Sequence, residues 1–536
     1  MRTLAAACSV LICVTLAAAA QQPSVADANA PADAAYAQGK SDEALKLYEQ
    51  VLAKDPQNIH ALVRSGMLLS WKGDYAEAVR RYDRALAADP GNSFARMERA
   101  KVLSWARQFP QAIAAFRQIL AAEPSNLEAQ LGVARVLSWS GDQAQARLEY
   151  MKVLERDPRN PEALVGVGQT YAWTGKSAAA REWYEKALAA RPKMREALVG
   201  IAYLDLAEGD VYAAWDKTSQ LESQFPKDKD VLELKSAVTR ARAPMFRFTF
   251  DRTDDTEENQ SDLFGVETGF ALPRRSDLTI GYSRYEISDL LRREGTIQSG
   301  FLSLVLRPTA AQRIVLRPGI ERFEKTDGSR GSEPVGRISY AAGVGRPVEL
   351  TLEAERRSFR ATTGTLNAGV MIDAYAATLL ARPHPSLRIV GTGAVWNLSD
   401  GNERTGFDGT FAYVWPAKAV RIETGYVFHY FDYQKDLSNG YFDPKGYTAH
   451  AGAVDLHKEF RPVYFHVFAE SGVQTFDFQG VRTDGDRYVT YAGTLGFRLT
   501  PTVSLELSGI KSDSSVQNPA GFESTQYSAR LRMHTR

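Results

Sequence analysis

The sequence predicts a fold of class α plus membrane β: an N-terminal helical solenoid followed by an antiparallel, membrane-spanning β-barrel of about sixteen strands. Three observations support this prediction. Prolines recur at a constant step of 34 residues through the first half of the chain. From Met245 onward, the helical period gives way to an alternation of apolar and polar residues. The connections between the alternating segments are short and long by turns, as in membrane barrels.

The composition limits the class of protein. The chain has 536 residues and a formal net charge of +1, so no surplus of basic residues argues for a nucleic-acid partner. Beyond the N-terminus there is no apolar run of about 18 residues, which argues against a helical membrane protein. The strands of a membrane barrel alternate in polarity, so the absence of a long apolar run does not exclude a barrel.

Residues 1–20 have the pattern of a secretory signal peptide. Arg2 precedes an apolar stretch from Leu4 to Leu16, and three consecutive alanines form a small-residue cleavage site. A lipoprotein anchor is the alternative, but neither cysteine lies where lipid attachment requires it. Both cysteines of the chain fall within this segment, so we expect a mature protein without disulfides or thiol-based sites. A linker over 21–30 follows.

Residues 31–242 contain an internal repeat with a period of 34 residues, which is the period of a pair of antiparallel helices. Proline ends each second helix, small alanines allow the helices to approach, aromatics fill the space beside them, and glycines end each first helix in a left-handed cap. The repeated residues are Pro56, Pro90, Pro124, Pro158, Pro192 and Pro226; Ala44, Ala78, Ala112, Ala146, Ala180 and Ala214; Tyr48, Tyr82, Phe116, Tyr150 and Tyr184; and Gly39, Gly73, Gly141, Gly175 and Gly209. Arg107 interrupts the glycine series, and Asp74 is placed to cap a second helix.

These positions resemble those of the tetratricopeptide repeat (TPR) family. The resemblance implies a superhelical scaffold of about six repeats with a concave binding surface, closed by a last capping helix over 228–242. It names no ligand. We therefore expect polysaccharide, periplasmic proteins or both to bind in the TPR groove.

Four tryptophans, Trp71, Trp105, Trp139 and Trp173, follow the same step and form a candidate binding surface. They lie near the end of each first helix, which lines the concave face in TPR arrays. Flat indole rings could stack on sugars or on the side chains of a partner. The alternative, which we favour from the sequence, is that they pack between neighbouring repeats.

The barrel is predicted over residues 245–536. In a representative segment Val348, Leu350 and Leu352 alternate with polar residues that would face a polar lumen. The candidate lumen residues chosen in this way are Arg313, Arg317, Glu349, Glu353, Arg421 and Glu423. Mixed charge is expected in any aqueous barrel interior, and guidance of a specific substrate is the alternative.

Short connections, most of them with proline, alternate with longer polar loops. The expected long loops include 251–262, 434–445 and 479–486. An even number of strands places both ends of the barrel on the side of the short turns, which is the periplasmic side in outer-membrane barrels. The pattern therefore places the solenoid in the periplasm.

The expected loop 434–445 contains a short motif, Asn439, Gly440, Tyr441, Phe442, Asp443 and Pro444. The motif resembles an Asn-Gly-Tyr-aromatic-x-Pro sequence in the barrel of cellulose exporters. A structured turn is the alternative, because Asn-Gly and Pro favour turns.

The order of the two parts, a TPR array before a barrel, resembles the cellulose synthase operon protein C family, the poly-N-acetylglucosamine porin family and YaiO-type proteins. The resemblance implies a porin-like outer-membrane protein that takes part in the export of an exopolysaccharide, the material of biofilms. The alternative is an outer-membrane anchor with a plugged, non-conducting barrel that carries a docking platform for proteins.

The sequence lacks the common motifs of enzymes. It has no HExxH, P-loop or GxSxG sequence, and its seven histidines are scattered. We therefore expect no catalysis, no cofactor and no metal. We expect contact with outer-membrane lipid and a monomeric barrel, since a closed barrel leaves no free strand edge.

Overall fold

The computed structural model describes residues 25–416, 420–437, 440–513 and 523–535. The expected signal peptide lies outside these residues. The chain divides into two compact units, residues 1–197 and 198–536, and each is described by itself.

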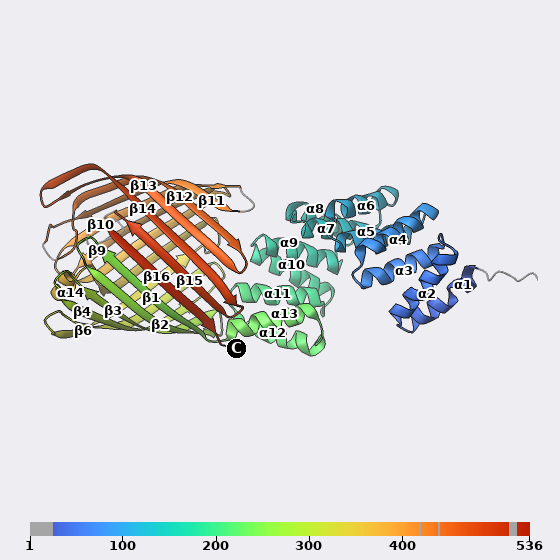
Figure 1. The fold of residues 1–536 in the computed structure, drawn as a ribbon, viewed down its shortest axis with the longest axis horizontal. Coiled ribbons are helices and arrows are strands. Elements are labelled where there is room, and N and C mark those ends of the chain that lie inside the picture. The colour runs from blue at the N-terminus through green and yellow to red at the C-terminus, as the bar shows by residue number, and fades with distance from the viewer. Residues whose placement is uncertain (1–24, 417–419, 438–439, 514–522, 536) are drawn as a thin grey trace, which may run out of the picture. The chain divides into compact units, whose positions relative to one another are not determined.

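The described chain is helical up to Arg242 and forms strands from Met245 onward (Figure 1). The first helix begins at Val25, within the segment expected to be a linker. The helices are α1 (Val25–Ala37), α2 (Ser41–Lys54), α3 (Ile59–Trp71), α4 (Tyr75–Ala88), α5 (Ser93–Trp105), α6 (Phe109–Ala122), α7 (Leu127–Trp139), α8 (Gln143–Arg156), α9 (Pro161–Trp173), α10 (Ser177–Ala190), α11 (Arg195–Ala207), α12 (Val211–Gln224) and α13 (Lys229–Arg242). None of the helices in the described part of the chain is both long enough and apolar enough to cross a membrane.

The repeated residues hold the helix pairs together. All six repeated alanines and all five repeated aromatics are buried. The ring of Phe116 on α6 lies on Gly132 of α7, where an added Cβ would come within 2.5 Å of the ring. The ring of Tyr150 covers Gly166 in the next repeat in the same way. Helices of neighbouring repeats therefore approach through a glycine under an aromatic ring.

The helix ends explain the spacing of glycine and asparagine. The five repeated glycines have φ between 72° and 96°, and Arg107 takes the same left-handed conformation with φ 58°. The backbone N–H of Glu77 donates to the side chain of Asp74, which confirms the predicted cap. A set of caps that the sequence reading missed repeats every 34 residues: Asn58, Asn92, Asn126 and Asn160 each accept an N–H bond at the start of a first helix.

Sixteen strands in the described residues form one closed antiparallel barrel, which confirms the predicted fold class. They are β1 (Met245–Asp255), β2 (Gln260–Leu272), β3 (Ser276–Ser288), β4 (Glu294–Leu306), β5 (Gln312–Glu324), β6 (Arg330–Ala342), β7 (Val348–Ser358), β8 (Met371–His384), β9 (Leu387–Leu398), β10 (Glu403–Trp415), β11 (Arg421–Tyr433), β12 (Lys445–Phe460), β13 (Val463–Phe478), β14 (Val481–Thr500), β15 (Val503–Ser512) and β16 (Ser524–His534). A short helix, α14 (Thr363–Ala368), lies between β7 and β8. The barrel closes where β1 pairs with β16 along the full length of both strands.

The two ends of the barrel are named here by their connections. The turn end is where β1 begins and β16 ends, and the loop end is opposite. Two expected long loops are wrong: strand pairing continues through most of 251–262, and 479–486 is a tight turn followed by the start of β14. The prediction took runs of polar side chains as loops. Backbone pairing does not depend on side-chain polarity and continues as far as the partner strand extends.

The last helices pack on the turn end within the second unit. Leu234 and Val238 of α13 belong to a buried apolar cluster against which Ala271 of β2 packs. Nη2 of Arg275, in the turn after β2, lies 2.6 Å from Oε2 of Glu208 before α12. Apolar burial and an ion pair therefore join residues from 198 onward to the barrel.

Candidate functional site in the barrel lumen

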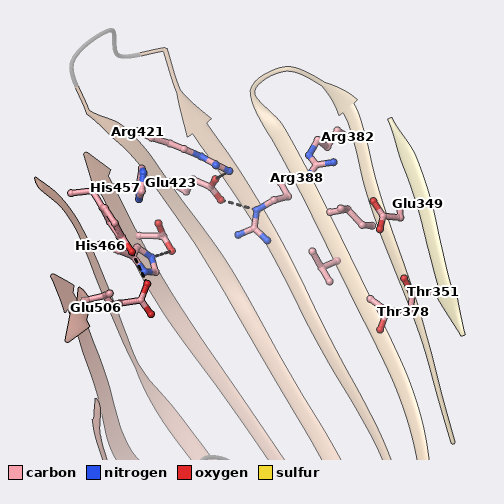
Figure 2. Close-up of a pocket in the computed structure, with 15 residues that line it drawn as sticks. Glu349, Thr351, Thr378, Arg382, Arg388, Arg421, Glu423, His457, His466 and Glu506 are labelled. Atoms are coloured by element: carbon pink, nitrogen blue, oxygen red, sulfur yellow. Dashed lines mark hydrogen bonds and ion pairs between the residues drawn. The ribbon is translucent and has the colours of Figure 1, made fainter. Parts of the chain in front are cut away.

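A polar hollow of about 730 Å³ lies in the lumen toward the turn end (Figure 2). Its lining comes from strands β7, β8, β9, β11, β12, β13, β14 and β15, so it faces the interior of the barrel. The apolar residues that alternate with this lining, such as Val348, Leu350 and Leu352 on β7, are exposed on the outer face. Strand alternation thus separates a polar interior from an apolar exterior.

Three charged side chains of this hollow form an ion-pair triad that joins β9 to β11 across β10. Nε of Arg388 on β9 lies 2.7 Å from Oε2 of Glu423 on β11, and Arg421 pairs with the other carboxylate oxygen (Figure 2). Glu423 is only 3% exposed. A carboxylate at this depth needs such partners to stay ionised. The structure thus brings the predicted Arg421 and Glu423 together with Arg388, which the sequence did not single out.

A second hollow of about 610 Å³ shares Tyr464 and Glu506 with the first. The hydroxyl of Tyr464 donates to Oε2 of Glu506 at 2.6 Å, and Arg530 lies 3.3 Å from the other oxygen. On the opposite side of this hollow, the guanidinium of Arg317 lies 3.6 Å from the centre of the Phe301 ring. The two hollows therefore lie next to each other, on either side of Tyr464 and Glu506.

The structure places the six predicted lumen residues on the inward face. Arg317, Glu349, Arg421 and Glu423 line the two hollows. Glu353 lies 3.8 Å from Arg337 of the neighbouring strand, on the same face. Arg313 shares the face of Arg317 by strand alternation and is exposed near the turn end.

The lumen at the loop end contains a buried aromatic cluster, called the plug here. It combines inward side chains of β11, β12 and β14 with two connections that fold back into the barrel, one over 359–370 and the other over the described residues 434–437 and 440–444. Its large members are Phe359, Phe431, Tyr433, Tyr441, Phe442, Tyr447 and Tyr488. The rings of Phe431 and Tyr447 stack with centres 4.3 Å apart.

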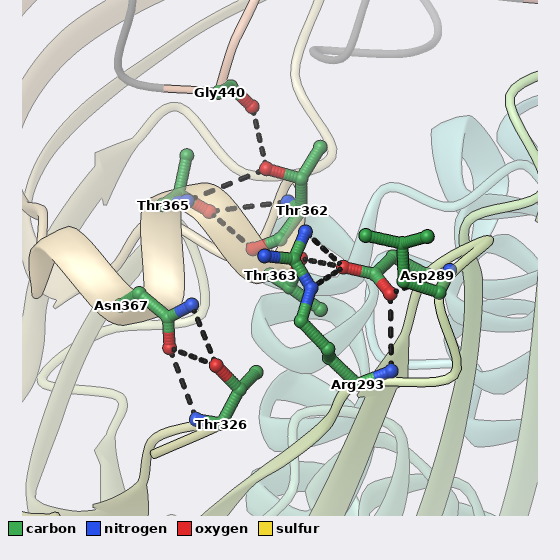
Figure 3. A network of polar contacts seen from close by, with 9 residues as sticks. Asp289, Arg293, Thr326, Thr362, Thr363, Thr365, Asn367 and Gly440 are labelled. Carbon is green, nitrogen blue, oxygen red and sulfur yellow. Dashed lines mark hydrogen bonds and ion pairs between the residues drawn. The ribbon is translucent and has the colours of Figure 1, made fainter.

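Polar contacts fix α14 in the plug (Figure 3). The Thr362 hydroxyl donates to the carbonyl of Gly440 at 2.6 Å, which joins the two folded-back connections. The Thr363 hydroxyl donates to Asp289 at 2.9 Å, and Asn367 bonds Thr326. Four separate connections at the loop end are therefore tied together through one six-residue helix.

The loop motif forms part of this plug. Asn439 lies outside the described residues, while Tyr441, Phe442 and Pro444 are buried. Gly440 has φ 81°, and a Cβ there would lie 2.8 Å from the Thr362 hydroxyl, so glycine is needed. The motif is thus a structured turn, the alternative that the sequence left open.

Asp443 of the motif is buried, and one of its carboxylate oxygens has no partner among the described residues. The other oxygen accepts the N–H of Leu437 at 2.6 Å. Burial raises the pKa of Asp443 to about 6, and the charges of Asp436 and Asp400 add to this shift against the lowering effect of the backbone N–H.

The four tryptophans of the repeats lie at the last residue of α3, α5, α7 and α9. Trp71, Trp105, Trp139 and Trp173 are 61%, 40%, 43% and 55% exposed, so packing between repeats covers only part of each indole. The Trp71 ring stacks on Tyr36 with centres 6.0 Å apart.

Within the described residues, no group of three or more His, Cys, Asp or Glu side chains is placed to hold a metal ion.

Two sequence models of the tetratricopeptide repeat match the first half of the chain. One matches residues 35–102, 72–136 and 103–164, and the other matches residues 140–195. These matches confirm the predicted TPR repeats. No curated protein sequence matches the chain.

Three solved structures are similar to parts of the chain. A tetratricopeptide repeat protein from Parabacteroides merdae ATCC 43184 is 22% identical, with 41% of this chain and 86% of that chain covered and a TM-score of 0.38. A bacterial polysaccharide outer membrane secretin is 11% identical, with 55% and 99% covered and a TM-score of 0.46. The type IV pilus biogenesis factor PilW is 18% identical, with 40% and 99% covered and a TM-score of 0.35. Each match covers only part of the chain.

Proposed function

We propose that this protein is an outer-membrane conduit that takes part, without catalysis, in the export of an exopolysaccharide. The observation that carries the proposal is a closed barrel of sixteen strands in the described residues, with two neighbouring polar hollows inside and apolar side chains outside. Such a barrel gives a hydrated polymer a polar path while its outer face contacts lipid.

The TPR repeats fit the periplasmic side in this proposal. Helices α12 and α13 pack at the turn end of the barrel, and in outer-membrane barrels the turn end faces the periplasm. The exposed tryptophan row then offers flat rings to a polysaccharide or to a periplasmic protein before the polymer reaches the barrel.

The plug implies that the conduit is closed at the loop end in the conformation described. Transport then requires that the connections 359–370 and 434–444 move out of the lumen. Their contacts to the wall include ring packing of Tyr441 on Tyr433 and the ion pair between Arg360 and Glu321 of β5.

The test is conductance of the full chain in planar bilayers. We expect small or no channels in the wild type, and a several-fold larger conductance when 360–369 and 435–443 are both replaced by short Gly-Ser turns. A matched control replaces 256–259, a turn at the same end that contributes no residue to the aromatic cluster. A barrel that never conducts, even without these two connections, would contradict the conduit.

A second candidate function is a docking platform, with the plugged barrel as its membrane anchor. The plug itself favours this candidate, because a permanently filled lumen passes no polymer. It predicts that periplasmic proteins co-purify with the chain, that their binding is lost when Trp71 and Trp139 are replaced by alanine, and that a deletion strain secretes its polymer normally.

A further inference from the structure

The two hollows at the turn end carry more positive than negative charge. Eight arginines and five carboxylates line them in the described residues, and no lysine does. One of these arginines, Arg360, is paired with the buried Glu321 behind the lining. A surplus of two arginines remains toward the space itself.

Most carboxylates of the lining already have an arginine or histidine partner. Glu423 lies between Arg388 and Arg421, Glu267 pairs with Arg247 at 2.7 Å, and Asp455 lies 2.8 Å from His466. Glu506 pairs with Arg530. These carboxylates therefore have little capacity left for a cationic ligand.

Three guanidinium groups of the described lining have no carboxylate within 4.0 Å, namely Arg317, which lies on the Phe301 ring, Arg382 and Arg532. Of these, Arg382 on β8 and Arg532 on β16 are exposed to the hollows. Glu349 is the one lining carboxylate in the described chain with no such ion pair. The groups left open to a ligand are thus mainly guanidinium groups.

Nearer the loop end, Glu353 lies 3.8 Å from Arg337, and Asp408 lies 2.7 Å from His429. Arg404, which has no carboxylate of the described residues within 4.0 Å, lies 4.1 Å from the centre of the Trp396 ring and 4.4 Å from that of the Phe431 ring. Aromatic rings cover that guanidinium, whereas Arg382 and Arg532 are exposed to the hollows, where the proposed function has the polymer enter.

A guanidinium group binds carboxylate, sulfate and phosphate with two parallel hydrogen bonds, and a polar space with low-dielectric walls strengthens its field. We infer that the turn end of the lumen recognises a polyanionic glycan, a chain that carries carboxylate, sulfate or phosphate groups on its sugars. This inference rests on the proposed function and narrows its substrate to one charge class. A polycation is repelled by the same groups.

Binding of short oligosaccharides to the full chain in detergent micelles tests the inference. Tetragalacturonate, maltotetraose and the chitosan tetramer represent an anionic, a neutral and a cationic glycan. We expect binding of tetragalacturonate that weakens as salt rises, and no binding of the other two.

The double variant Arg382→Gln with Arg532→Gln should weaken binding of tetragalacturonate by about five-fold or more. A matched control, Arg322→Gln with Arg346→Gln, removes the same charge from the outer face and from a turn, and should bind as the wild type does. This control also separates the lumen from anion binding elsewhere on the chain.

The inference is overturned if the chitosan tetramer binds more tightly than tetragalacturonate, if no glycan binds, or if the lumen variant binds unchanged. The proposed function fails by different results, namely a barrel that does not conduct without its plug or normal secretion in a deletion strain. The two failures are therefore distinguishable.

Discussion

The two ends of the barrel lumen are built from the same alternating strands, but one end has a polar hollow and the other has a buried aromatic cluster. On β11, Arg421 and Glu423 face the hollow of about 730 Å³ near the turn end, while Phe431 and Tyr433 on the same face are buried in the plug. The side of the strand is the same, and ten residues separate the two environments. What differs is the chain that covers them: two connections fold back at the loop end, and no turn-end connection does so among the described residues.

The difference shows that a side chain that points into a barrel can be surrounded either by water or by other side chains. The inward direction alone does not decide between the two. Charged pairs occupy the part of the lumen that stays hollow, where water shares in their solvation. Stacked rings occupy the part that the chain fills, where only apolar groups are buried without cost. Function follows this division, because a ligand can enter only the hollow part.

The largest expected effect comes from truncating a ring in the plug. Tyr447 is fully buried and stacks on Phe431, so Tyr447→Ala should lower the free energy of unfolding by about 3–5 kcal/mol. Tyr464→Ala, in the hollow, should cost about 1 kcal/mol, because water replaces the lost contacts. Urea unfolding in micelles measures both, and equal losses would remove the distinction between a dry and a wet end.

The next effect concerns the pH dependence of the plug. The pKa of Asp443 is raised to about 6, so its protonated form is favoured in the folded state. The stability it contributes is fully present below the ordinary pKa of about 4 and is lost as the pH rises through about 6.

Wild-type protein should therefore gain about 1–3 kcal/mol in plug stability between pH 8 and pH 5 relative to Asp443→Asn. Hydrogen exchange of residues 434–437 and 440–444, compared between the two proteins at both pH values, measures this difference. The variant keeps an oxygen for the N–H of Leu437, so it should fold. An identical pH response in both proteins would show that Asp443 does not control the plug.

The smallest effect concerns a charged pair in the hollow. Glu423→Gln removes the charge between Arg388 and Arg421 and should destabilise the barrel by only about 1 kcal/mol, because both guanidinium groups remain within reach of water. The same change should raise affinity for tetragalacturonate. A loss as large as that of Tyr447→Ala would mean that the turn end is as dry as the plug.

Much of the solenoid could be predicted from single positions. Ala44, Tyr48 and Pro56 identify the small contact, the filling ring and the helix end of every repeat, because each repeat meets its neighbours with the same geometry. The exposure of Trp71 and its equivalents could not be predicted, since a ring that packs and a ring that binds have the same sequence period.

In the barrel too, properties that depend on local geometry could be predicted, and properties that depend on long-range contacts could not. The alternation identified Glu349, Glu353 and Glu423 as inward, because side-chain direction follows from strand geometry alone. Arg388 was missed: its partner Glu423 is 35 residues away in sequence, and only the pairing of three strands brings them together. A plugged barrel was the alternative that the sequence left open, but the segments that form the plug were not predicted. The strand ends near 255 and 481 were misjudged because polarity does not mark where pairing stops.

The sequence by itself determined the helical repeat, the number of strands and the face on which each strand residue lies, since these depend on periods of 34 and two residues that local geometry imposes. Tertiary structure alone decided which stretch of the lumen is hollow, which guanidinium groups keep a free face, and where the loop motif is buried. Those properties depend on chain segments that come into contact only after the barrel has closed. The periodicity of the sequence carries no information on such contacts.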